Sequence, residues 1–165
     1  MSKVLFLDID GVLNSNFWND NHQTEISNGT LIDEEKIKLL ALLVKETGAE
    51  IILHSGWRFW FDAECKPLCM EAAKLTALLA KENLYISGVT PDLTTEEIRN
   101  TKRFSLVKAD EILLWISLHN SLTEWVVLDD LDLHNEQIRQ HQVKTDQTVG
   151  LTLADVRQAV KILKS

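Results

Sequence analysis

The chain has 165 residues, of which 45% are hydrophobic and 25% are charged, and its formal net charge is −8. This size and composition are typical of one globular domain whose core is large enough to fold without disulfide staples. The acidic balance argues against a protein that coats nucleic acid or anionic membranes, although it is compatible with a local basic site. We therefore expect a single domain over residues 1–165.

The beginning of the chain shows no sign of a targeting segment or a membrane span. Its first apolar run, Val4–Leu7, stops at Asp8 and is too short for either. The two cysteines, Cys65 and Cys69, do not make a disulfide framework. We expect a cytoplasmic protein with reduced thiols and no membrane partner.

The first part of the chain is expected to form a strand, a loop, a helix and a second strand. Lys3–Leu7 is a continuous apolar run, which is typical of a strand buried on both faces. Residues 14–32 are polar and rich in asparagine, so we expect a long loop there. Asp33 is a good N-cap for a helix that ends at Gly48, and Glu50–Leu53 is the second strand.

The rest of the chain continues the alternation. The expected elements are a helix from Pro67 to about Asn83, a strand at Leu84–Val89, an irregular segment at 92–107, a helix at Ala109–His119, a strand at Trp125–Leu128, an edge strand at Gln142–Lys144 and a final helix capped by Thr152. This order predicts an α/β fold, in which helices cover both faces of a parallel sheet. The Lys3–Leu7 strand is expected to lie between those at 50–53 and 125–128.

Polar residues of an unusual kind follow three of these strands. Asp8 and Asp10 come after the first, and their side chains point the same way on an extended backbone. Ser55 follows the second strand, and Asp129 and Asp130 end the fourth. Ligands bind at this edge of a parallel sheet, where the carboxyl ends of the strands meet. Clustered carboxylates favour a hard divalent cation such as Mg²⁺, whereas unrelated turn and capping aspartates are the alternative interpretation.

These residues occur in the order that the haloacid dehalogenase-like (HAD) superfamily shows. Asp8-Ile9-Asp10-Gly11-Val12-Leu13 resembles its first motif, Ser55 its second, Lys108 before a helix its third, and Val127-Leu128-Asp129-Asp130 its fourth. A wider pattern resembles the HAD domains associated with RNA-repair proteins: Ser-Gly-Trp-Arg at 55–58, a helix starting at Asp110-Glu111-Ile112, Thr145-Asp146 and Gly150-Leu151-Thr152. The resemblance implies a three-layer Rossmann-like HAD fold.

The resemblance also implies a catalytic role for four residues. Asp8 would be the nucleophile that forms an aspartyl-phosphate, and Asp10 would protonate the leaving oxygen and then activate water. Ser55 would donate a hydrogen bond to a phosphoryl oxygen. Lys108 would neutralise the charge on the nucleophile and on the phosphoryl group.

The implied cofactor is Mg²⁺. Asp130 would bind it directly, with Asp8 and the backbone carbonyl of Asp10 as further ligands, and Asp129 would lie on the metal or just behind it. The third motif is the least specific of the four, because Lys102 and Arg103 are close enough in sequence to replace Lys108.

Two segments bear on substrate choice. Residues 14–32 and 56–107 occupy the positions where HAD enzymes insert caps. The first segment is too short for a folded cap, and the core itself requires most of the second, which leaves a modest insertion, so we expect little or no cap and an open site. Gly56, Trp57 and Arg58 are the candidate substrate-binding residues, with the arginine for phosphate and aromatic faces for a base. Hydrophobic packing is the alternative for the aromatic run at 57–61, and His54 is expected to be a packing or surface residue.

The leading functional hypothesis is a Mg²⁺-dependent phosphatase. Its favoured substrate is a nucleic-acid end or a nucleotide, and small phosphate esters are the other substrate class considered. The alternative is a non-catalytic module that binds phosphate or a protein partner on a HAD-like scaffold. A response-regulator receiver domain combines similar residues, but its acidic pair and its phosphorylated aspartate occur in a different order.

Overall fold

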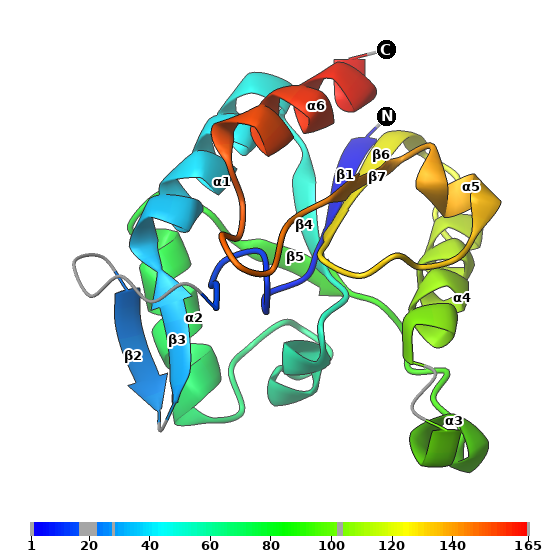
Figure 1. Cartoon of the computed structure of the whole chain (residues 1–165), viewed down its shortest axis with the longest axis horizontal. Coiled ribbons are helices and arrows are strands. Elements are labelled where there is room, and N and C mark those ends of the chain that lie inside the picture. The colour runs from blue at the N-terminus through cyan, green and yellow to red at the C-terminus, as the bar shows by residue number, and fades with distance from the viewer. Residues whose placement is uncertain (1, 17–22, 28, 102–103, 165) are drawn as a thin grey trace.

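A five-stranded parallel sheet forms the centre of the computed structural model, which describes residues 2–16, 23–27, 29–101 and 104–164 (Figure 1). Its strands are β1 (Ser2–Leu7), β4 (Glu50–Leu53), β5 (Ile86–Val89), β6 (Leu122–Asp129) and β7 (Gln142–Lys144), in the spatial order β5-β4-β1-β6-β7. The first strand therefore lies between β4 and β6 and is parallel to both, as predicted.

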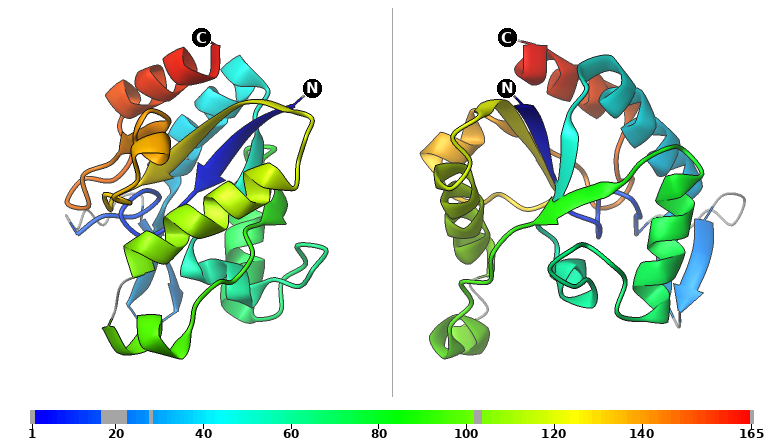
Figure 2. Two further views of the ribbon diagram at one scale, coloured as in Figure 1. Left: turned by 90° about the vertical axis from the view of Figure 1, so that its right-hand side faces the viewer. Right: turned by 180° about the vertical axis from the view of Figure 1, so that it is seen from behind.

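Helices cover both faces of the sheet and make a three-layer α/β fold (Figures 1 and 2). One face carries α1 (Glu34–Thr47), α2 (Met70–Ala80) and α6 (Leu153–Lys164), and the other carries α4 (Phe104–Ser117) and α5 (Glu136–Arg139). Side chains alternate along β1, so Leu5 and Leu7 pack on the first face and Val4 and Phe6 on the second. Burial on both faces explains why β1 is apolar from Val4 to Leu7.

The helix ends follow the capping residues that the sequence provides. The Asp33 carboxylate accepts a hydrogen bond from the backbone N–H of Glu35 at the start of α1, and Gly48 ends the helix with a φ of 71°. At the start of α6, the Thr152 hydroxyl accepts from the Asp155 N–H, and the Asp155 carboxylate accepts from the Thr152 N–H. All three predicted caps, Asp33, Gly48 and Thr152, are confirmed.

The prediction of an unstructured loop over 14–32 is wrong in its second half. An antiparallel hairpin is present there, formed by β2 (Gln23–Ser27) and β3 (Thr30–Asp33). Its buried side chains, Ile26 and Ile32, pack into the main core, which explains how so polar a segment becomes ordered. Ile26 and the pair Leu31-Ile32 are the apolar residues of the segment 23–33, and so few of them are too weak a pattern to predict a strand.

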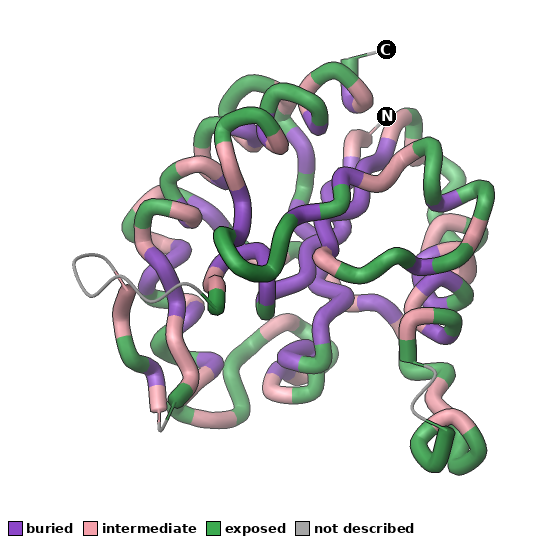
Figure 3. Tube along the Cα trace, viewed as in Figure 1, coloured by how far each residue is buried: buried purple, intermediate pink, exposed green. Residues whose placement is uncertain are grey.

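Two helix boundaries also differ from the prediction. The second helix begins at Met70 because Pro67 forms an antiparallel bridge with Phe61, beyond the short 3₁₀ helix η1 (Gly56–Trp60). The segment at 92–107 is largely helical, since α3 (Glu96–Thr101) is followed by the start of α4. None of the residues of α3 is buried, whereas β1, β4 and β6 are buried over most of their length (Figure 3).

Candidate active site at the carboxyl edge of the sheet

The chain turns sharply after β1, and this turn places Asp8 and Asp10. The Asp8 N–H donates to the Leu128 carbonyl of β6 at 3.0 Å, which extends the sheet pairing by one residue. Gly11 then adopts a φ of 81°, and a Cβ added there would come within 2.5 Å of the Asp130 side chain. Only glycine meets both constraints, so the glycine of the first motif lets the first and fourth motifs pack together.

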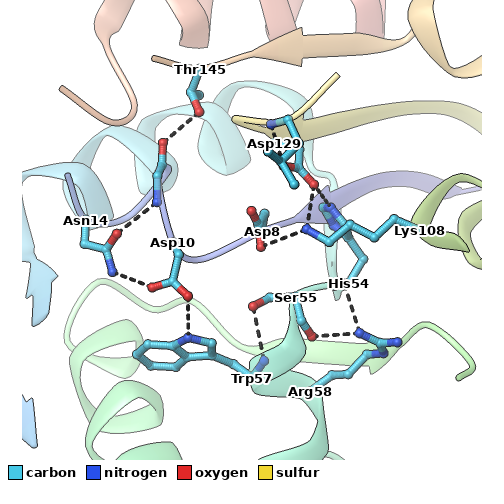
Figure 4. Close-up of polar contacts among 12 residues, drawn as sticks. Asp8, Asp10, Asn14, His54, Ser55, Trp57, Arg58, Lys108, Asp129 and Thr145 are labelled. Carbon is cyan, nitrogen blue, oxygen red and sulfur yellow. Dashed lines mark hydrogen bonds and ion pairs between the residues drawn. The ribbon is translucent and has the colours of Figure 1, made fainter. Parts of the chain in front are cut away.

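A cluster of four side chains, Asp8, His54, Lys108 and Asp129, forms the centre of the site (Figure 4). Three of them are buried and Lys108 is 14% exposed, and we call this group the buried cluster. The Lys108 ammonium lies 3.0 Å from Asp129 Oδ2 and 3.5 Å from Asp8 Oδ1. His54 Nε2 lies 2.8 Å from the same Asp129 oxygen. The cluster therefore joins the ends of β1, β4 and β6 to helix α4.

The two buried carboxyls of this cluster have pKa values that are shifted in opposite directions. Burial raises the pKa of Asp8 well above its usual range, and the carboxylate of Asp129 adds to the effect. Burial opposes ionisation of Asp129 too, but the hydrogen bond from His54 and the charge of Lys108 hold the pKa of that carboxyl far below its usual value. The carboxylates of Asp8 and Asp129 outweigh burial and raise the pKa of Lys108.

His54 is a neutral donor in this arrangement. Burial lowers the pKa of its imidazole, and within the described part of the chain Nδ1 has no hydrogen-bond partner. We place the proton on Nε2, which donates to the ionised Asp129. The expectation of a packing or surface role for His54 therefore misses its contact with the site, because a lone histidine in the sequence shows no partner.

Asp10 faces away from the buried cluster and toward an open cavity of about 590 Å³. Its carboxylate accepts from Asn14 Nδ2 at 2.9 Å and from the Trp57 indole N–H at 3.2 Å. Asn14 also accepts from the Gly11 N–H and donates to the Leu31 carbonyl of the hairpin. Asn14, which the sequence analysis did not single out, thus holds both the turn and the carboxylate.

Asp130 and Ser55 complete the residues expected from the motifs. The Asp130 carboxyl is half-buried beside Gly11 and lines the same cavity as Asp10. Burial and the neighbouring Asp129 carboxylate raise its pKa. Ser55 is buried at the end of β4, where its hydroxyl oxygen accepts from the Trp57 N–H at 3.2 Å and caps η1.

The three candidate substrate residues have different surroundings. Gly56 is exposed and lines the cavity, whereas Trp57 lines it with one part of its ring but is buried and packs in the main core with Phe61, as the packing alternative expects. Arg58 is buried, and its guanidinium lies 2.7 Å from the Glu111 carboxylate and donates to the carbonyls of His54 and Ser55. These contacts show Arg58 as a brace between η1, the end of β4 and α4, which differs from the phosphate ligand expected from the sequence.

Lys108 lies inside α4, four residues beyond its first residue, and not just before a helix as predicted. The difference in helix boundary does not remove it from the site, because one turn of α4 faces both Asp8 and Asp129. The two alternatives, Lys102 and Arg103, lie outside the described residues.

The donor set fits a hard divalent cation. Asp8, Asp129 and Asp130 lie close enough for each to change the pKa of another, and among the described residues Lys108 is the single cation that pairs with this group. Asp8, His54 and Asp129 also place ligand atoms within 4.8 Å of one another. Because Asp129 already binds His54 and Lys108, the less committed oxygens are those of Asp8 and Asp130.

Fold and site together define the class of protein: a parallel α/β domain with a HAD-like phosphatase scaffold, in which Asp8, Ser55, Lys108 and Asp129 lie at one edge of the sheet. The chain belongs to the family described as the HAD domain in Swiss Army Knife RNA repair proteins, whose family model matches residues 4–156. Comparison with curated proteins and with solved structures gives no significant match.

In the described part of the chain, no helix has both the length and the apolar character of a membrane span.

Proposed function

We propose that the protein is a Mg²⁺-dependent phosphatase that works through an aspartyl-phosphate on Asp8. The observation that carries this proposal is the pairing of two aspartates with opposite surroundings. Asp8 lies buried beside the Lys108 ammonium, 3.5 Å away, whereas Asp10 faces the open cavity and is held there by neutral donors. This arrangement suits one carboxylate as the nucleophile and the other as the proton carrier.

In the first step, an Asp8 oxygen forms a bond to phosphorus while the bond between phosphorus and the leaving oxygen breaks. Asp10 transfers its proton to the leaving oxygen. Asp10 then accepts a proton from water as the water oxygen attacks phosphorus, which releases inorganic phosphate and restores the Asp8 carboxylate. Lys108 reduces the negative charge at Asp8, and the Ser55 hydroxyl donates to a phosphoryl oxygen.

Asp8, Asp130 and the carbonyl of Asp10 would hold Mg²⁺, and the bound cation would supply positive charge that offsets the repulsion between the substrate and the carboxylates. Asp129 would act behind this set through its contacts with His54 and Lys108. Burial and the neighbouring Asp129 carboxylate raise the pKa of both Asp8 and Asp130, and a cation bound between these two side chains would favour their ionised forms.

The proposed substrate is a phosphorylated nucleic-acid end or nucleotide. The printed description of the family, which refers to RNA repair, supports this class. The cavity beside Asp10 supports it too, because about 590 Å³ is within the usual range for ligand pockets. The net charge of −8 favours contact with the end of a strand over binding along its length.

The test is turnover of p-nitrophenyl phosphate and of oligonucleotides that carry a 3′- or a 5′-phosphate. We expect turnover with Mg²⁺, loss of turnover with EDTA, and recovery when Mg²⁺ is restored. The Asp10→Asn variant should fail most with poor leaving groups and in hydrolysis of the phosphorylated enzyme, because both steps transfer a proton. Binding without turnover of any substrate in the panel would support the non-catalytic module.

A further inference from the structure

A second cavity, of about 390 Å³, opens on the other side of the phosphoryl site. Its lining includes Lys108 of the buried cluster, the exposed aromatic rings of Phe59 and Phe104, Arg99 and Gly56. Figure 4 shows the relation: Asp10 and Trp57 lie on one side of Asp8, and Lys108 and Arg58 lie on the other. We propose that this second cavity binds a nucleobase of the substrate, next to the nucleotide that carries the phosphate.

The chemistry of the lining points to a flat aromatic ligand. Phe59 is 54% exposed and Phe104 is 42% exposed, and both line the second cavity. Exposure of two large apolar rings to water is unfavourable, so a ligand that covers them would gain free energy of binding. The Arg58 guanidinium lies 4.4 Å from the centre of the Phe59 ring and is itself held by Glu111. A ring braced in this way loses little entropy when a base stacks on it.

The charges at the mouth of the cavity fit a nucleotide linkage better than a long polyanion. Arg99 is exposed and lines the cavity, where it can meet a phosphodiester. Asp92 lies on the same lining, and its carboxylate already accepts from the Thr94 N–H. Among the described lining residues, Arg99 is the one exposed cation and lies on the same lining as Asp92, so we expect stacking to contribute to the affinity beside this charge.

The position of the second cavity indicates which nucleotide of the strand places its base there. Asp10, the proton donor to the leaving oxygen, faces the first cavity, so the sugar of the phosphorylated nucleotide belongs there. The two cavities share Gly56, which is exposed, and a Cβ added to it would meet nothing within 4 Å. A strand can therefore cross at Gly56 and place its next base between Phe59 and Phe104. The inferred substrate is an oligonucleotide end rather than a mononucleotide, and this inference rests on the proposed function.

The first experiment measures selectivity. We would compare kcat/KM for adenylate pentamers carrying a 3′- or a 5′-phosphate with kcat/KM for the matching adenosine monophosphate. Wild type should prefer one of the pentamers, and Phe104→Ala should reduce that preference at least ~5-fold, the loss expected for one stacked base. Phe104→Trp should keep the preference, whereas Phe104→Leu, which is apolar but not aromatic, should lose it.

A matched control is Leu118→Ala, because Leu118 is 68% exposed and does not line the cavity; it should leave the preference as in wild type. Equal kcat/KM for pentamers and mononucleotide, or a full preference in Phe104→Leu, would overturn the stacking site. Turnover of p-nitrophenyl phosphate reports the proposed function separately, since that substrate carries no second nucleotide whose base could stack on Phe104.

The second experiment needs no turnover. Fluorescein-labelled, phosphorylated adenylate pentamers would be titrated with the Asp8→Asn variant and followed by anisotropy. Adding Phe104→Ala should weaken binding of the preferred pentamer at least ~5-fold, and Phe104→Trp should not. Unchanged binding in the Phe104→Ala background would overturn the inference whether or not the wild type is a phosphatase.

Discussion

The buried cluster and the rim of the first cavity use the same kind of side chain in opposite ways. Asp129 is fully buried, and its two oxygens accept from His54, Lys108 and the Leu131 N–H. Asp130, the next residue, is half-buried and turns toward the cavity. Neighbouring residues at the end of a strand point to opposite sides, so one aspartate becomes a fixed part of the site and the other remains open to a ligand.

The same contrast separates Asp8 from Asp10. Asp8 lies among charged groups that cannot move far, which favours a nucleophile held in one position. Asp10 is held by the neutral side chains of Asn14 and Trp57 and borders the cavity, which suits a group that must give up and regain a proton. Substitutions in the buried cluster should therefore affect chemistry, stability or both, whereas the effect of Asp10 and of its hydrogen-bond donors should show chiefly in proton transfer.

The largest effect should come from Asp8→Asn. The amide has nearly the same shape but is not an anionic nucleophile, so turnover of p-nitrophenyl phosphate should fall at least ~10³-fold, about 4 kcal/mol in barrier height. The fold should be as stable as that of wild type or more so, because burial makes the Asp8 charge unfavourable. Full activity in this variant would show that Asp8 is not the nucleophile.

Glu111→Ala should test the brace beneath the site. It leaves the Arg58 guanidinium buried without its carboxylate partner, and it also removes the acceptor of the Leu93 N–H. We expect the free energy of unfolding in urea to fall by about 3 kcal/mol. Glu136→Ala is the control, because its ion pair with Arg139 is exposed and its loss should change stability little.

His54→Phe should have a smaller effect, on stability. The ring is kept but the donor to Asp129 is lost, and a hydrogen bond to a buried charge contributes about 2 kcal/mol. His54→Gln, which can still donate, should lose less. Urea unfolding at neutral pH would measure both variants, and equal stability of wild type and His54→Phe would contradict the contact.

His54 also predicts a dependence of stability on pH. Burial lowers its pKa in the folded protein, so below about pH 6.5 the unfolded histidine takes up a proton that the folded one does not. The contribution of His54 to stability is complete above that pH and declines as the pH falls. The stability difference between wild type and His54→Gln should therefore shrink on acidification, and a difference that grows would contradict the assignment of a neutral imidazole.

The smallest expected effect is at the rim. Trp57→Phe removes the indole donor 3.2 Å from Asp10, which frees the carboxyl to move. Turnover of substrates with poor leaving groups should fall on the order of 10-fold, in keeping with the loss of one hydrogen bond to a charged group. Turnover of p-nitrophenyl phosphate should fall less, since p-nitrophenolate leaves without a proton. Equal losses for both substrates would place Trp57 outside the proton-transfer step.

Much of the fold could be predicted because its signals are local and strong. Apolar runs identify the buried strands, and the caps at Asp33, Gly48 and Thr152 mark helix ends. The hairpin at 23–33 and the early start of α4 could not be predicted, because these segments fold through contacts with elements that are distant in the sequence. Ile26 is buried in the main core, and Val107 is buried although its neighbours in sequence are polar or exposed.

The sequence by itself determined which strands end in carboxylates and in what order, and hence the family and the residues expected to act. Only the tertiary structure decided how each side chain is used. His54 and Asp129 are 75 residues apart in the chain, and Arg58 and Glu111 are 53 apart. Burial and partners set the pKa of a carboxyl and the availability of a guanidinium, and partners so distant leave no pattern in the neighbouring residues.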